Sequence, residues 1–211
     1  MQYLLSLLIW IPILGGAYVL FAGRESHPNA ARSLSLLIII ICLLLCIPLI
    51  MAFDSSTAAM QFVEKYQWLP ALGVSYHLGI DGVSMLMIVL TTFTTLTIIF
   101  ATWYSIQQKV IQYLASLLFL QGILVGVFSA LDAILFYIFW EALLIPMFLI
   151  IGVWGSSNRI YASIKFFLYT FIGSVLMLVS FLYMGVKAGT FDIQAFYTLP
   201  LGFTAQLLIF I

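Results

Sequence analysis

The amino-acid sequence predicts an all-α polytopic membrane protein. Hydrophobic residues make up 65% of the 211-residue chain, charged residues only 7%, and the mean hydropathy is +1.24. The apolar residues gather in runs of about 20, the length that an α-helix needs to cross the hydrocarbon layer. The formal net charge of zero gives no sign of a nucleic-acid partner. The lipid bilayer is therefore the expected surrounding of a single membrane domain, residues 1–211.

Six full spans and the start of a seventh are expected along the chain. They cover residues 3–21, 34–53, 83–104, 113–131, 133–154 and 161–186, followed by 202–211. The last run has about ten residues, which is too short to cross, so the chain is expected to stop inside a span. No basic segment precedes the first span, and it is longer than the apolar part of a signal peptide, so it is interpreted as a permanent helix.

The connections between the spans predict their arrangement. The basic residues of alternate connections fall into two groups: Arg24, Arg32, Lys109, Arg159 and Lys165 on one side, Lys65 and Lys187 on the other. Basic residues are enriched in the connections on the internal side of a membrane, so five against two predicts that the N-terminus lies outside. Residues 131–133 barely separate the fourth and fifth spans, which must be antiparallel neighbours. In the long external connection, 54–82, residues 73–78 could form a short strand or an irregular segment.

Glu141 is the main candidate for a functional residue. It lies within the apolar run 133–154, about 12 Å from one end and about 20 Å from the other at 1.5 Å per residue. Placing an acidic side chain there costs on the order of 3 kcal/mol, and such residues usually mark an ion or proton pathway. Burial favours the neutral acid and a nearby cation or water favours the carboxylate, so the group can take and release a proton.

Pro146 follows five residues later and cannot donate a hydrogen bond to the carbonyl of Ala142. That acceptor is expected to be free for a water or a side chain, with a helix distortion at this point. The structural alternatives are a tolerated proline kink and a permanently protonated Glu141 that bonds a neighbouring helix.

Lys165 lies about four residues into the sixth span, so it could simply extend to the internal interface. It could instead face inward and contribute, through water, to a polar relay or channel toward Glu141. Direct pairing is not expected, because the depths of the two residues differ by about 10 Å.

For three polar residues near the external ends of the spans, a structural role is the default interpretation. Asp81 and Asp132 each precede a span, where a carboxylate caps a helix and favours its positive end. His77 is a lone histidine in the external loop, and such a residue is more often a hydrogen-bonding residue than a ligand.

Cys42 and Cys46 lie inside a span with no ligand spacing around them, so no metal site is expected. Threonines of the third span and Gln121 of the fourth predict hydrogen bonds between helices.

Three segments resemble a known family. They are "HLGIDGVSMLM" at 77–87, "LDAILFYIFWEALLIPMFLIIGVWG" at 131–155 and "SIKFFLYT" at 163–170. They resemble the antiporter-like membrane subunits of respiratory complex I. The tryptophan-glutamate pair occurs across that family, whereas the continuation "LIPM" is similar to the M-type subunit of bacterial NADH-quinone oxidoreductase.

The resemblance implies a fold of about 14 helices with two inverted five-helix repeats in the bacterial inner membrane. It also implies a proton channel, coupled at a distance to quinone reduction by NADH, with no redox centre in this chain. NADH, flavin, iron–sulfur clusters and quinone are expected in other subunits of the complex, and the partners are its other membrane subunits. The helix-five glutamate of the family, here Glu141, pairs with a lysine on a broken seventh helix, a position that would lie beyond Ile211.

Two other functions stay open. One is a subunit of a multi-subunit cation/proton antiporter without redox partners. The other is a structural or assembly subunit in which Glu141 only bonds neighbouring helices.

Overall fold

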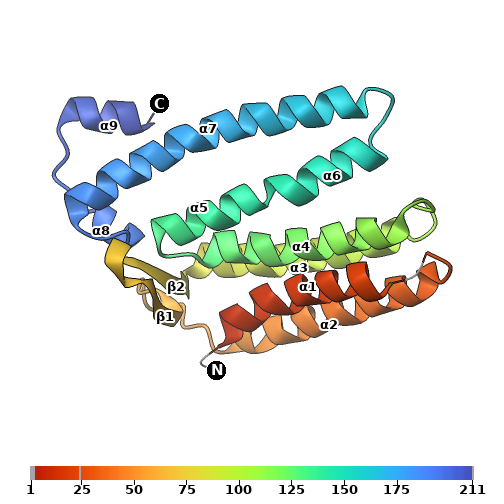
Figure 1. The fold of residues 1–211 in the computed structure, drawn as a ribbon. Helices are drawn as coiled ribbons and strands as arrows, with labels where there is room; N and C mark the ends of the chain where they lie inside the picture. The colour runs from red at the N-terminus through yellow and green to blue at the C-terminus, as the bar shows by residue number, and fades with distance from the viewer. Residues whose placement is uncertain (1–2, 24, 211) are drawn as a thin grey trace.

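The computed structural model describes residues 3–23 and 25–210 and consists mainly of long helices that run side by side (Figure 1). Within this described part, six helical spans are long and apolar enough to cross a membrane, as expected. The first four are α1 (Leu4–Ala22), α2 (Pro28–Met51), α3 (Gly82–Ala101) and α4 (Val110–Ser129). The fifth span consists of α5 (Ala133–Ala142) and α6 (Leu144–Trp154), and the sixth is α7 (Arg159–Ala188). The short helices α8 (Ile193–Phe196) and α9 (Phe203–Phe210) follow.

Helix α4 forms the centre of the packing. In its most apolar window, 72% of the residues are buried, against 6% in α7. Glycines allow α1 to approach it closely: a Cβ on Gly122 would lie 2.5 Å from the carbonyl oxygen of Ile9, and one on Gly16 would lie 3.1 Å from that of Ala115. Small residues at such crossings let helix backbones pack without intervening side chains. Helices α2 and α3 complete this four-helix group.

Two clusters of buried apolar side chains fill the interior. One includes Leu5, Leu8 and Ile88 and extends to Leu135 and Phe139 on α5. The other lies around Ile39, Ile99 and Leu118. Cys42 and Cys46 are fully buried free thiols of the first cluster, as packing residues would be. Between α3 and α4, the Gln121 amide donates a 2.9 Å hydrogen bond to the Thr92 hydroxyl, so one polar bond joins two spans inside the apolar layer.

The long connection between α2 and α3 folds as a β-hairpin. Strand β1 (Gln61–Leu69) pairs antiparallel with β2 (Val74–Ile80), with Lys65 opposite His77, and the 3₁₀ turn η1 (Pro70–Leu72) joins them. Gly73 ends this turn at φ +68°, a conformation that glycine adopts without strain. The strand alternative for residues 73–78 is therefore correct. Strand β1 was not predicted, although its aromatic and β-branched residues and the following Pro-Ala-Leu-Gly turn are typical of a hairpin.

Backbone hydrogen bonds join the hairpin to the segment between α4 and α5, and join that segment to the one after α7. The amide of Leu131 donates to the carbonyl of His77 at 2.8 Å, the amide of Ala133 to that of Phe191 at 2.8 Å, and the amide of Ile193 to that of Leu131 at 2.9 Å. The short segment between α4 and α5 thus lies between β2 and the segment that follows α7. At this end of the molecule, the hairpin, α5 and α7 are held together (Figure 1).

Several helix bounds differ from the expected spans. Helix α2 begins at Pro28, six positions earlier, because proline at the first helical position fits a helix start that hydropathy alone does not reveal. Helix α7 has 30 residues, about 45 Å, which exceeds a hydrocarbon layer of about 30 Å. Residues 203–210 of the expected seventh run form α9, and Ile211 lies outside the described residues.

Candidate functional site

The fifth span breaks next to Glu141. Helix α5 ends at Ala142 and α6 begins at Leu144, so Glu141 occupies the last turn of α5. Pro146 has no N–H for the Ala142 carbonyl, whereas the flanking bonds Leu143 N to Phe139 O (3.2 Å) and Met147 N to Leu143 O (3.3 Å) are present. The interruption is therefore local. It leaves one backbone acceptor without its helical donor, directly after the carboxyl-bearing residue.

The carboxyl group of Glu141 faces α7. The hydroxyl of Ser174 donates a short hydrogen bond to Oε1 of Glu141, and the same hydroxyl lies 2.9 Å from the carbonyl oxygen of Phe171 on its own helix. Ser174 is only 4% exposed, and Glu141 is half-buried. Tyr137, one helical turn before Glu141, brings its phenol near both groups. Tyr137, Glu141 and Ser174 are called the α5–α7 polar group below.

Ser174 was not singled out in the sequence. Serine is common in membrane helices, where its hydroxyl bonds the carbonyl one turn back, so its type carries no functional signal. Ser174 and Glu141 are 33 positions apart in the sequence, a separation that no local sequence pattern predicts. Only the antiparallel packing of α5 on α7 reveals the pair.

Lys165 lies away from this group. Its side chain is exposed, and its ammonium lies over the ring of Tyr161 on the same helix, 5.7 Å from the centroid. Ser174 is nine residues further along α7, which corresponds to about 13 Å along the axis. The structure therefore does not bring Lys165 into contact with Glu141. Among the residues described, the lysine that pairs with a carboxylate is Lys65, whose partner is Asp192.

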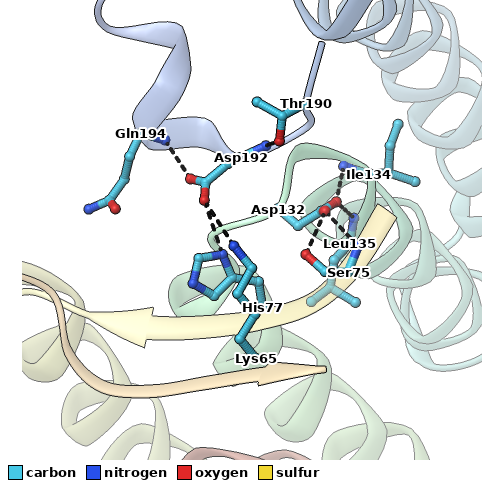
Figure 2. A network of polar contacts seen from close by, with 9 residues as sticks. All are labelled: Lys65, Ser75, His77, Asp132, Ile134, Leu135, Thr190, Asp192 and Gln194. Carbon is cyan, nitrogen blue, oxygen red and sulfur yellow. Dashed lines mark hydrogen bonds and ion pairs between the residues drawn. The ribbon is translucent and has the colours of Figure 1, made fainter. Parts of the chain in front are cut away.

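A second polar group lies between the hairpin and the start of α8 (Figure 2). Oδ2 of Asp192 is 3.4 Å from Nζ of Lys65 and 3.4 Å from Nδ1 of His77. Lys65 is largely exposed, whereas the side chain of His77 is 7% exposed. We call Lys65, His77 and Asp192 the hairpin ion cluster. His77 and Lys65 belong to paired strands, so the hairpin presents both to the same carboxylate.

Burial is the main cause that lowers the pKa of His77 below its ordinary value, and the positive charge of Lys65 acts in the same direction. The carboxylates of Asp192 and Asp132 act against this shift without cancelling it. The imidazole is therefore neutral at pH 7, and Lys65 with Asp192 is the pair that carries both charges.

Asp132 and Asp81 both cap helices. Oδ1 of Asp132 accepts from the amides of Ile134 (3.0 Å) and Leu135 (3.1 Å), while its Oδ2 accepts from the amide of Ser75 at 2.9 Å, as Figure 2 shows. One buried carboxylate thus fixes the start of α5 and joins it to β2. Asp81 is simpler, because its Oδ1 accepts from the amide of Ser84 at the start of α3 at 2.7 Å.

Glu64 of strand β1 was also not singled out in the sequence. It is 4% exposed, and its Oε1 accepts from the amides of Leu5 (2.9 Å) and Ser6 (3.3 Å) in the first turn of α1. A carboxylate at this position satisfies amides that lack helical partners and interacts favourably with the positive helix end. The hairpin therefore caps α1 from a distance of 59 positions in the sequence, which no local pattern reveals.

The fold and the embedded carboxyl define a class, the multi-pass antiporter-like membrane proteins. Respiratory complex I from Thermus thermophilus with bound NADH contains a chain that matches 98% of this one with a TM-score of 0.82 at 27% identity; the match covers 41% of that chain. The Mrp complex from Dietzia gives the same TM-score over 97% of this chain and 22% of its own, and its 16% identity shows the fold alone.

Sequence comparison gives more similar relatives. The model described as NADH:quinone oxidoreductase/Mrp antiporter, TM, matches residues 130–211. Subunit M of the NADH-quinone oxidoreductase from Rhodobacter capsulatus is 45% identical over 196 residues, 92% of this chain and 38% of that protein. Chain 4 of the NADH-ubiquinone oxidoreductase from Arabidopsis thaliana is 40% identical over 98% of this chain and 42% of its own length. The chain is similar to the M subunits of this family and spans about two fifths of their length.

Proposed function

We propose that this chain is part of a proton-translocating membrane subunit of an NADH-quinone oxidoreductase, in which quinone reduction in other subunits drives proton transfer through this one. The observation that carries the proposal is Glu141, a carboxyl group within a broken membrane helix that faces a hydroxyl group. A group with such neighbours can exist both as the acid and as the carboxylate. Glu141 takes up and releases the transferred proton.

The proposed mechanism is a charge relay. Glu141 pairs with a lysine of a later helix, and the pair alternates between charged and neutral states as a proton passes. The Ala142 carbonyl freed by Pro146 provides a hydrogen-bond acceptor for water beside the carboxyl group. Lys165 lies toward the internal side and contributes, through water, to a proton path rather than to direct contact.

The chemistry of the whole complex belongs to other subunits in this proposal. The NADH, flavin, iron–sulfur clusters and quinone bind elsewhere, and this chain contributes to the membrane part beside other membrane subunits. A bacterial inner membrane with the N-terminus outside fits the distribution of basic residues.

Replacing Glu141 by Gln in the assembled full-length complex tests the proposal. The amide cannot ionise, so we expect proton pumping to fall at least tenfold per electron transferred, with assembly intact. Pumping is measured in inverted membrane vesicles by quenching of a pH-sensitive dye, and electron transfer by NADH oxidation. Glu25→Gln, at an exposed carboxyl between α1 and α2, is the matched control and keeps wild-type pumping. Full pumping by Glu141→Gln would refute the role of Glu141.

The two alternatives give different results in the same preparations. A cation/proton antiporter subunit, which the likeness in fold to the Mrp complex favours, would exchange sodium for protons without NADH and would purify without iron–sulfur subunits. A purely structural subunit would lose assembly in Glu141→Gln, because the hydrogen bond to Ser174 would weaken. Normal assembly with lost pumping separates the proposed function from both.

A further inference from the structure

The hydroxyl of Ser174 has two acceptors within reach. One is the Glu141 carboxyl on α5, and the other is the Phe171 carbonyl one turn back on α7, 2.9 Å away. A serine hydroxyl has a single proton to donate, although its oxygen can also accept. Ser174 can therefore donate to only one of the two groups at a time.

The protonation state of Glu141 decides which acceptor is used. An ionised carboxylate can only accept, so the Ser174 hydroxyl must point toward it. A protonated carboxyl can donate its own proton to the Ser174 oxygen, and the hydroxyl then turns to the Phe171 carbonyl. In both states the Ser174 hydroxyl has an acceptor for its proton, and the two states differ by rotation of one hydroxyl.

We infer that Ser174 is a positioning residue whose hydroxyl turns each time Glu141 gains or loses its proton. This inference rests on the proposed function and names the residue that orients the Glu141 carboxyl group. A hydrogen bond to a carboxylate is about twice as strong as one between neutral groups, so the Ser174 hydroxyl holds Glu141 more firmly after proton loss than before it. In both states it keeps α7 attached to α5.

Few other ionisable groups lie near enough to have this effect. Tyr137 on α5 is the titratable neighbour of the pair. Helix α4 offers only Tyr113, which packs edge-on against Trp154 at the far end of α6. The lysines of α7, Lys165 and Lys187, are about 13 Å and about 20 Å from Ser174 along the helix. His77 lies at the external end of α5, beyond its first turn.

Substitutions of Ser174 in the full-length complex test the inference. Ser174→Ala removes the donor, and we expect the pH at half-maximal pumping to move upward by about one unit. Ser174→Thr keeps the hydroxyl and keeps the wild-type profile. Ser163→Ala is the matched control, because Ser163 is a buried serine of the same helix whose hydroxyl donates only to the Ile160 carbonyl, at 2.9 Å. It also keeps the wild-type profile.

Infrared difference spectroscopy gives a readout that does not depend on pumping. The carboxyl stretch that disappears in Glu141→Gln belongs to Glu141, and Ser174→Ala is expected to shift that band while Ser163→Ala leaves it in place. If Ser174→Ala does not assemble, Ser174→Cys, with similar volume and a weak donor, is expected to shift the band and the profile by smaller amounts.

The outcomes separate this inference from the proposed function. An unchanged band and pH profile in Ser174→Ala would overturn the inference, while lost pumping in Glu141→Gln would still support the function. Conversely, retained pumping in Glu141→Gln would refute the function, and the shifted band alone would then support the hydroxyl switch.

Discussion

At the scale of single residues, the acidic side chains differ in how their charge is accommodated. The chain has seven of them, and six lie in loops, in the hairpin or at helix ends. There, backbone amides are available as donors: Asp132 and Glu64 accept two amides each from helix starts. Glu141 is the exception. It lies in the last turn of α5, and its donor is a side chain of another span.

This difference explains which site residues can be predicted from sequence. Glu141 is evident because a carboxyl group in an apolar run is costly wherever the run packs. Asp81 and Asp132 are evident because capping depends on neighbours in the sequence. Ser174, Glu64 and Asp192 are not evident, because their partners come from elements 33, 59 and 127 positions away. Tertiary packing alone creates their roles.

The pKa of His77 gives a prediction at the same scale. Because burial and Lys65 lower this pKa below 6.5, the neutral imidazole is the stable form, and its stabilising contribution is lost as the pH falls from about 6.5 through the lowered value. Lys65→Gln removes one cause, so we expect the pKa of His77 to rise, and only slightly because the charge of Lys65 is exposed and screened. Hydrogen–deuterium exchange of the imidazole ring, followed by mass spectrometry over a pH series, measures it. A lower pKa in Lys65→Gln would contradict this account.

At the scale of helices and strands, hydropathy predicts the spans better than their ends. Each predicted span overlaps a helix, because about 20 apolar residues in a bilayer must satisfy their backbone groups internally. The start of α2 at Pro28 was missed, since residues 28–33 are too polar for a hydropathy window. The hairpin was only half anticipated, because an external loop carries no such constraint. The break after Ala142 was expected from Pro146.

The crossing of α1 and α4 gives the prediction for this scale. A Cβ at Gly122 would lie 2.5 Å from the Ile9 carbonyl oxygen and 2.6 Å from an Ile13 side-chain carbon. A backbone oxygen cannot move aside as a flexible side chain can, so we expect Gly122→Ala to destabilise the subunit by about 1–3 kcal/mol. Thermal unfolding of the purified complex measures the loss. Gly173→Ala on α7, where a Cβ would meet nothing within 4 Å, is the control and is expected to leave stability unchanged.

At the scale of the whole molecule, the two ends of the helical layer differ in chemistry. One end holds the hairpin, the hairpin ion cluster and the short segment before α5 (Figures 1 and 2). The opposite end holds the connections 25–27, 102–109 and 155–158. There, Arg32 is buried, donates to the Ile106 carbonyl at 2.8 Å and lies over the ring of Trp103. The structure thus separates the connections into the two groups on which the predicted orientation depends.

That orientation can be tested with single cysteines at the two ends. Ala58→Cys places a thiol in the exposed loop before β1, and Ser157→Cys places one in the exposed loop between α6 and α7. Because five of the seven basic residues belong to the end that carries Ser157, we expect that end to be internal. A membrane-impermeant maleimide should label the Ala58→Cys variant in intact cells and the Ser157→Cys variant only in inverted vesicles. Cys42 and Cys46, at most 1% exposed, should not react and give a low background. The reverse labelling pattern would place the hairpin and the N-terminus inside and overturn the proposed orientation.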